Sequence, residues 1–216
     1  MMCCKNGAGK TTFIKLLCRY YDPTQGTILL NNIDIRRFDY DEYQKLLATV
    51  SQDYRLLSFT IKENIVFDRA GEVTDEQVER LLKENGFGDK LENLEDGIHT
   101  YVHKNFEEKG FEPSGGEGQK IALSRALYKD APFVILDEPT AALDPRAEYE
   151  IYKRFHKMVE GKTAVFVSHR LASSKFCDKV VVFENGRVRE YGTHEELLNI
   201  DGYYAELFHM QADFYV

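Results

Sequence analysis

The feature that most constrains this chain is a glycine-bearing loop near residue 6 that runs directly into a helical pattern. The loop consists of Asn6, Gly7, Ala8, Gly9, Lys10, Thr11 and Thr12. Directly after it, apolar side chains recur at helical spacing, at Phe13, Leu16, Leu17 and Tyr20. A Gly-Lys-Thr sequence that opens a helix is the pattern of a P-loop, whose backbone binds nucleotide phosphates. We therefore expect a nucleotide site around this loop.

The chemistry of such a loop accounts for its residue types. Backbone N–H groups in the loop and at the helix start point at phosphate oxygens. Lys10 reaches the β- and γ-phosphates, and the Thr11 hydroxyl binds Mg²⁺. The alternative, a glycine-rich turn before a helix, needs neither side chain. Cys4 stands where the full pattern has glycine, and only residues 1–5 can form the preceding strand, so we expect a loosely held loop.

A second acidic site follows an apolar segment further along the chain. The segment 133–136 reads Phe-Val-Ile-Leu, as in a buried strand, and Asp137 and Glu138 come directly after it. In the Walker B arrangement the first acid positions Mg²⁺. The second could orient or deprotonate an attacking water as a general base. The alternative is that both acids merely end a buried strand and meet solvent.

The order of elements predicts an α/β fold with a P-loop-type parallel sheet flanked by helices. From Ser114 onward we expect a helix to about residue 128, the strand at 133–136, a helix at 146–158 and a strand at 164–167. We further expect a helix at 74–86 in a helical subdomain of about residues 68–128, with the N-terminal β portion largely missing. Short strands are expected at 27–30, 33–35, 46–51, 180–183 and 187–191, with Asn185-Gly186 as a hairpin turn and Thr193 opening a last helix.

Composition excludes several classes of protein. The 216 residues carry 36 acidic and 28 basic side chains, a net charge of −8, which argues against bulk nucleic-acid binding. The four cysteines form no C-x-x-C pair and are expected to be reduced thiols in a cytosolic compartment. No run of about 18 apolar residues is present, so a membrane role would come through a partner chain.

Two adjacent glycines open the helix predicted from residue 114. Ser114, Gly115, Gly116 and Glu117 are consecutive. A capping box between Ser114 and Glu117 explains the serine and the glutamate but not the glycines. Each glycine costs up to about 1 kcal/mol relative to alanine in a helix, so a close backbone approach by another group is indicated. Because the P-loop already holds one triphosphate, this second anion site most simply serves nucleotide on another copy of the chain.

Taken together, these motifs resemble the ATP-binding-cassette (ABC) ATPases over essentially the whole chain, and they occur in family order. Asn6 to Thr12 resembles the Walker A loop, Gln52 the Q-loop glutamine, Ser114 to Glu117 the signature, Asp137 and Glu138 the Walker B pair, Asp144 the D-loop aspartate and His169 the switch histidine. The family signature is Leu-Ser-Gly-Gly-Gln. Pro113 and Glu117 are therefore departures, although both are compatible with the start of a helix.

The resemblance implies roles for three single residues that would otherwise have ordinary explanations. Gln52 would touch Mg²⁺ and the attacking water, whereas a glutamine on a loop is usually just solvated. His169 would contact the γ-phosphate as charge develops, whereas alone it reads as a capping or surface histidine. Asp144 precedes Pro145 and is fully explained as a helix N-cap. Its D-loop role comes from the resemblance alone.

Two segments resemble the exporter type of the family. These are residues 105–111, an acidic loop before the signature, and residues 60–65, which follow Gln52. Family members carry one more β-rich segment before the Walker A loop, including an aromatic residue that stacks on adenine. Exporters also carry a membrane domain upstream. The resemblance therefore implies that residues 1–216 are one ABC ATPase domain truncated at its N-terminus.

The implied function is ATP binding and hydrolysis as the nucleotide-binding domain of an ABC exporter. Two such domains would form a head-to-tail dimer around two Mg²⁺-ATP, coupled to an ABC transmembrane domain at the cytoplasmic face of the plasma membrane, with no nucleic-acid partner. Two alternatives remain. One is a truncated, catalytically weak or inactive remnant, which the short first strand favours. The other is a non-transport ABC ATPase, for which a coiled-coil insertion or a basic face would argue.

Overall fold

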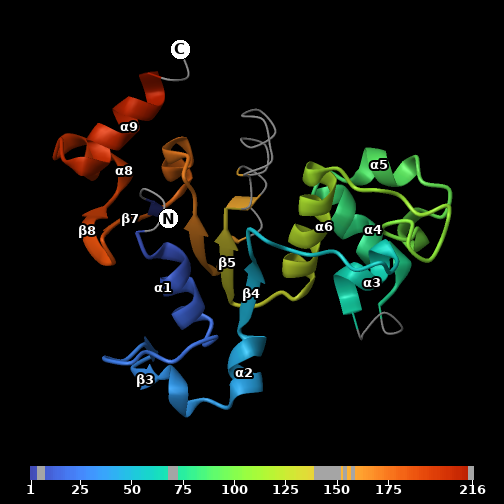
Figure 1. The fold of residues 1–216 in the computed structure, drawn as a ribbon, viewed down its shortest axis with the longest axis horizontal. Coiled ribbons are helices and arrows are strands. Elements are labelled where there is room, and N and C mark those ends of the chain that lie inside the picture. The colour runs from blue at the N-terminus through green and yellow to red at the C-terminus, as the bar shows by residue number, and fades with distance from the viewer. Residues whose placement is uncertain (4–7, 68–72, 139–151, 153–154, 157–158, 214–216) are drawn as a thin grey trace. The chain divides into compact units, whose positions relative to one another are not determined.

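The computed structural model of the chain describes residues 1–3, 8–67, 73–138, 152, 155–156 and 159–213 (Figure 1). Two compact units make up the chain. Unit 1 comprises Met1–Leu47, Pro132–Glu138 and Lys162–Val216, and unit 2 comprises Ala48–Ala131 and Pro139–Gly161. Each unit is built around its own apolar core.

A six-stranded sheet confirms the predicted α/β fold. Its strands are β1 (Met2–Cys3), β4 (Leu47–Val50), β5 (Phe133–Asp137), β6 (Thr163–Val167), β7 (Val180–Glu184) and β8 (Arg187–Gly192). Their order in the sheet is β4-β5-β6-β1-β7-β8. β5, β6, β1 and β7 are parallel neighbours, and β8 pairs with β7 in the antiparallel sense. Short as it is, β1 occupies the middle of the sheet, directly before the P-loop.

Both short antiparallel pairs that the turn residues predict are present in unit 1. A separate two-stranded antiparallel sheet joins β2 (Leu29–Leu30) to β3 (Ile33–Asp34). Its turn residues Asn31 and Asn32 have φ of 49° and 64°, a left-handed region that asparagine tolerates. Asn185 and Gly186, with φ of 49° and 74°, likewise form the turn between β7 and β8. The helical elements of unit 1 are α1 (Lys10–Leu17), η1 (Ile35–Arg37), α2 (Tyr40–Lys45), η4 (Leu171–Phe176), α8 (His194–Asn199) and α9 (Tyr203–Asp213).

The core of unit 1 lies between α1 and the central strands. Ile14 of α1 and Cys18, which directly follows α1, pack with Met2, Val167 and Phe183. Burial, followed by the negative charge of Asp137, raises the pKa of the Cys18 thiol to about 11. This thiol is therefore neutral at physiological pH and acts as a small apolar side chain rather than a nucleophile.

The regular elements that the structure describes in unit 2, apart from the end of β4, are helical. Its elements are α3 (Ile61–Val66), α4 (Asp75–Glu84), α5 (Gly88–Glu92), η3 (Gly97–His99) and α6 (Gly115–Tyr128). Capping boxes open α3, α4 and α6, which confirms the one expected at Ser114 and Glu117. Most of the helix expected at 146–158 lies outside the described residues, and the subdomain boundary at 68–128 stays a prediction. None of the described helices is long and apolar enough to cross a bilayer.

Asn64 holds together the backbone that leads into α3, and its side chain is completely buried. Its Oδ1 accepts the Leu57 N–H at 2.8 Å, and its Nδ2 donates to the carbonyl oxygens of Leu57 and Thr60 at 2.9 and 3.0 Å. An isosteric apolar side chain would leave the Leu57 N–H without this partner, and the carbonyl oxygens of Leu57 and Thr60 would keep only their bonds from the N–H groups of Phe59 and Asn64.

We expect Asn64→Leu to lower the free energy of unfolding by about 2–4 kcal/mol, since several buried polar groups lose their bonds at once. Urea titration followed by circular dichroism measures the change. The exposed Asn93 of unit 2 provides the control, and Asn93→Leu should change the free energy by less than about 1 kcal/mol. Equal losses in the two variants would contradict the bracing role of Asn64.

Candidate active site

The carboxyl ends of three adjacent parallel strands meet at one edge of the sheet. Met2 of β1 pairs with Val167 of β6, and Val167 pairs in turn with Asp137 of β5. Backbone hydrogen bonds continue past the strand ends. The Glu138 N–H donates to the Val167 carbonyl at 3.0 Å, and the Ser168 N–H donates to the Met2 carbonyl at 3.3 Å. Ligand sites of parallel α/β sheets lie at this edge. The P-loop, the Walker B acids and His169 therefore emerge side by side.

The P-loop ends at the start of α1 in a geometry suited to an anion. Gly9 is the N-cap, with a φ of 102° that favours glycine, and no side chain caps the first turn. Uncapped amides at a helix N-terminus can donate to phosphate oxygens. Lys10 opens the helix and is buried, whereas Thr11 and Thr12 are exposed. Ala8 is partly buried, and Asn6 and Gly7 lie outside the described part of the chain.

The turn between β7 and β8 supports the P-loop, a role that the sequence analysis missed. The Gly186 N–H donates to the Ala8 carbonyl at 3.1 Å. A Cβ atom added at Gly9 would lie 3.3 Å from the Gly186 Cα, so the two backbones approach closely. Asn185-Gly186 was recognised only as a hairpin turn. No local signal indicates this contact, because the turn alone accounts for Gly186 with its φ of 74° and nothing lies within 4 Å of a Cβ added there.

Glu138 adopts an unusual backbone conformation and contacts His169. Its φ is 51°, in the left-handed region that residues other than glycine seldom adopt. Its Oε1 lies against Nε2 of His169. The Glu138 side chain is 14% exposed and that of His169 is 36% exposed, so a water or phosphate group can reach the pair. Strained backbone of this kind is characteristic of functional sites.

Asp137 offers a mostly buried carboxylate at the same edge, with an exposed fraction of 8%. Its negative charge reaches Cys18 on α1, where it contributes to the raised thiol pKa. Carboxylate and hydroxyl oxygens are the ligands that Mg²⁺ prefers. The oxygen donors of Asp137 and of the exposed Thr11 therefore fit a magnesium ion bound together with phosphate groups.

The signature residues form the N-terminal end of the 14-residue helix α6 in unit 2. Ser114 N–H donates to the Glu117 carboxylate at 2.7 Å, and the Ser114 Oγ accepts the Glu117 N–H at 3.3 Å. Burial opposes ionisation of Glu117, but the bonds from Ser114 and Lys90 outweigh it and hold the Glu117 pKa below its usual value. Glu117 is thus ionised, and its carboxylate is engaged in the capping box of α6. The Tyr54 hydroxyl donates to the Gly115 carbonyl at 2.8 Å and braces this turn.

The remaining predicted site residues are distributed as follows. Gln52 is exposed in a turn of unit 2. Gly115 is exposed and Gly116 is partly exposed at the start of α6, also in unit 2. Asp144 lies outside the described residues. Unit 1 therefore brings together the P-loop end, Asp137, Glu138 and His169, and the roles of the unit 2 residues stay predictions.

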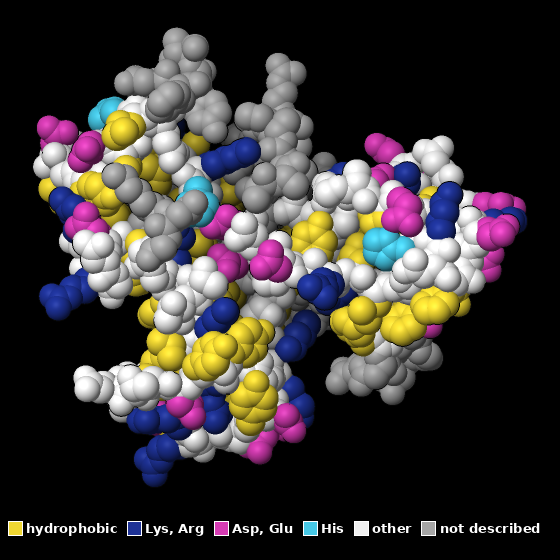
Figure 2. Space-filling model, viewed as in Figure 1, with side chains coloured by type: hydrophobic (Ala, Val, Ile, Leu, Met, Phe, Trp, Pro, Cys, Tyr) yellow, Lys and Arg dark blue, Asp and Glu magenta, His cyan; other side chains and the backbone are white. Residues whose placement is uncertain are grey.

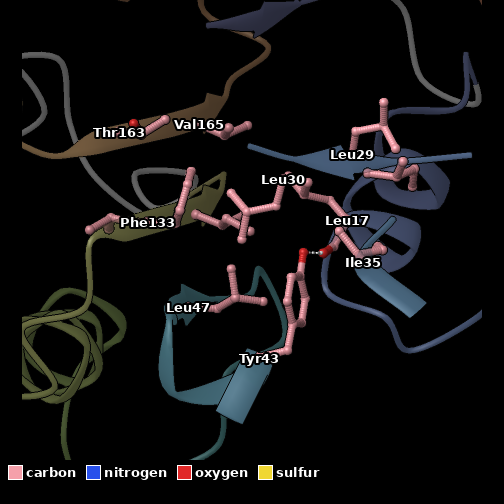
Figure 3. A pocket seen from close by; sticks show the side chains of 12 residues that line it. Leu17, Leu29, Leu30, Ile35, Tyr43, Leu47, Phe133, Thr163 and Val165 are labelled. Carbon is pink, nitrogen blue, oxygen red and sulfur yellow. Dashed lines mark hydrogen bonds between the residues drawn. The ribbon is translucent and has the colours of Figure 1, made fainter. Parts of the chain in front are cut away.

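A cavity of about 90 Å³ in unit 1 is apolar and separate from this edge (Figure 3). Leu30, Leu47, Phe133 and Val165 point into it, and the Tyr43 hydroxyl beside it donates to the Leu17 carbonyl at 2.7 Å. None of the predicted site residues lines the cavity. Its chemistry does not suit phosphate groups.

Comparisons with known proteins agree with the geometry. A family model described as ABC transporter matches residues 2–141. The mitochondrial iron-sulfur clusters transporter ATM1 of Candida glabrata is 39% identical over 211 residues, covering 96% of this chain and 28% of the relative. The ATP-dependent lipid A-core flippase of Cupriavidus pinatubonensis is 38% identical over 208 residues, covering 95% of the chain and 35% of the relative.

A solved structure is similar over nearly the whole chain. It is that of a bacterial Atm1-family ABC exporter with ATP bound, and it matches with a TM-score of 0.89 and 34% identity. The match covers 98% of this chain and 36% of that one. The chain thus spans about a third of the length of the relatives it matches.

Proposed function

The chain belongs to the ABC transporter family, and from this premise we propose that it binds and hydrolyses Mg²⁺-ATP as the nucleotide-binding domain of an exporter. The observation that carries the proposal is the Glu138–His169 pair. Both residues follow parallel strands at the sheet edge where the P-loop begins, and Glu138 is held there at a φ of 51°. A domain that only bound phosphate, without hydrolysing ATP, would not require a carboxylate in this backbone conformation beside the P-loop.

Binding of ATP rests on the P-loop and the start of α1. The amides of the first turn donate to phosphate oxygens, and the Lys10 ammonium pairs with the β- and γ-phosphates. Asp137 and Thr11 would hold Mg²⁺, which supplies positive charge against the phosphates when bound. Burial of Lys10 and Asp137 strengthens these electrostatic contacts, because they are shielded from bulk water.

Hydrolysis is assigned to Glu138 and His169. A water molecule beside the Glu138 carboxylate attacks the γ-phosphorus, its proton passes to Glu138, and the bond from the γ-phosphorus to the bridging oxygen breaks to leave ADP. His169 Nε2 lies at the Glu138 carboxylate. Once ATP is bound, its one N–H would turn from Glu138 to the γ-phosphate and donate a hydrogen bond there as charge builds up. The phosphoryl transfer itself then requires positioning and charge stabilisation more than covalent chemistry.

A second copy would complete each site in a head-to-tail dimer. The open glycines Gly115 and Gly116 at the start of α6 leave backbone amides accessible to the γ-phosphate held by Lys10 of the other copy. Asp144 would act at the same interface. A two-fold dimer of this kind uses the same surface on both copies and traps two ATP molecules.

A membrane domain is the proposed second partner, at the cytoplasmic face of the plasma membrane. Exporter relatives support this assignment. Leu57 and Phe59 precede α3 and are 42% and 46% exposed, and Figure 2 shows hydrophobic side chains gathered on unit 2 near α3. Acidic and basic side chains are interspersed on the face drawn there, so this face offers no continuous basic surface to a nucleic acid.

The dimer is tested by sedimentation of the Glu138→Gln protein with Mg²⁺-ATP, in which hydrolysis is blocked. We expect ATP to shift the protein from monomer to dimer, and an added Ser114→Arg change to abolish the shift while ATP still binds. Thr74→Arg is the matched control, because Thr74 opens α4 in the same unit with an equivalent capping box. Equal dimerisation with and without Ser114→Arg would contradict the assigned role of the signature.

A further inference from the structure

The loop that carries His169 is held by a side chain from the last helix of the chain. Gln211 of α9 donates from Nε2 to the His169 carbonyl at 2.6 Å. Its Oε1 accepts the Leu171 N–H at 2.9 Å. One amide thus bonds the backbone on both sides of Arg170. The second bond has an ordinary N–H···O length, and the first is shorter than usual.

The amide of Gln211 is chemically specific for this task. It contains one donor and one acceptor, which match the carbonyl of His169 and the N–H of Leu171. A carboxylate of the same length could accept from Leu171 but would repel the carbonyl oxygen. An apolar side chain of the same length would do neither.

The α9 helix is itself anchored firmly enough to act as a fixed support. The Glu190 carboxylate of β8 accepts the N–H groups of Tyr203 and Tyr204 at 2.7 and 2.8 Å and so caps the helix start. A Cβ atom at Gly202 would lie 2.5 Å from Glu190 Oε1, so glycine makes room for this cap. Figure 1 shows α9 as the last helix of the chain, and it packs against η4.

One face of α9 carries three successive side chains that contact the rest of unit 1. Tyr204, Phe208 and Gln211 are spaced by four and three residues, which places them on the same side of the helix. The Tyr204 hydroxyl is buried, 2.6 Å from Ser174 Oγ and 2.7 Å from His194 Nδ1. The Phe208 ring packs edge-on against the His194 ring of α8, with 5.1 Å between ring centroids. Gln211 therefore reaches the His169 loop from a helix face that is already fixed by packing.

We propose that Gln211 is a positioning residue that sets the backbone of the His169–Leu171 loop and thereby aims the His169 imidazole at Glu138 and the γ-phosphate. The inference rests on the proposed function of His169 and extends it to a helix outside the nucleotide-binding motifs. It makes the last helix of the chain part of the catalytic geometry. Any partner or ligand that displaced α9 would lower hydrolysis without touching the nucleotide.

The first test measures position directly and requires no catalysis. In the purified protein, Gln211→Met should accelerate hydrogen exchange of the Leu171 amide and shift the NMR signal of the His169 ring, which is identified by its loss in His169→Gln. Met210→Leu is the matched control, because Met210 is the neighbouring residue on α9 and is half exposed. It should change neither signal. An unchanged Leu171 amide and His169 ring in Gln211→Met would overturn the proposal.

The second test measures hydrolysis. Misplacement of a catalytic group by about 1 Å can cost about a hundredfold in rate, and we expect Gln211→Met to lower kcat by about ten- to a hundredfold. The KM for ATP should stay within about twofold, because the loop does not form the P-loop contacts. Gln211→Glu should behave like Gln211→Met, since a carboxylate cannot donate to the His169 carbonyl.

The two tests separate the possible failures. A shifted His169 signal with unchanged kcat would show that the contact exists but does not position a catalytic group, and would overturn the proposal. Gln211→Met could melt at a much lower temperature than Met210→Leu. In that case kcat is compared between the wild-type protein and Gln211→Glu, below the melting temperature of that variant. An unchanged kcat in Gln211→Glu would then contradict the inference. A wild-type protein without ATP turnover would refute the proposed function, while the NMR measurements would still decide whether Gln211 holds the loop.

Discussion

Glu138→Gln is expected to stop ATP hydrolysis and to leave ATP binding intact. Glutamine keeps the size and the hydrogen-bonding reach of the side chain, but it cannot accept the proton of the attacking water. General-base catalysis is commonly worth about 10²- to 10⁴-fold in rate, so kcat should fall by at least about a hundredfold. Steady-state phosphate release measures turnover, and a fluorescent ATP analogue measures affinity.

The control for this change is Glu195→Gln, which removes the same charge from the exposed first turn of α8 in the same unit. Its turnover should equal that of the wild-type protein. Wild-type turnover in Glu138→Gln would remove Glu138 from the mechanism. Loss of ATP binding together with turnover would instead mean that Glu138 supports the shape of the site and not the proton transfer.

Lys10→Ala is expected to weaken ATP binding by about ten- to a hundredfold or more. Hydrogen bonds to charged groups contribute about 1.5–3 kcal/mol, and each 1.4 kcal/mol is a factor of ten in affinity. The burial of Lys10 increases the effect, because no solvent screens its charge at the start of α1. Titration of the fluorescent ATP analogue measures the dissociation constant directly.

Lys15→Ala provides the matched comparison, since Lys15 is exposed and lies in the last turn of the same helix. It removes one positive charge from α1 without touching the phosphate site, so affinity should change by less than about threefold. Similar weakening in both variants would point to the net charge of the protein rather than to a phosphate contact. Unchanged binding by Lys10→Ala would refute the assignment of the P-loop site.

Features that depend on neighbouring residues could be predicted from the sequence. The capping box of Ser114 and Glu117 closes over three residues, and the turn at Asn185-Gly186 needs only a backbone that tolerates positive φ. The apolar segment before Asp137 required burial on both faces, which indicated a central parallel strand. Local physical chemistry decided these elements, and the structure confirms each of them.

The sequence by itself determined the fold class and the residue types that could bind phosphate or activate water. It could do so because the spacing of a motif depends on contacts within one turn or one strand. Only the tertiary structure decided how those residues meet. The left-handed φ of Glu138 and its contact with His169 arise where β5 and β6 end in register. The support of the His169 loop by Gln211 spans 42 residues. Such contacts depend on how distant segments pack against one another, which residue periodicity does not record.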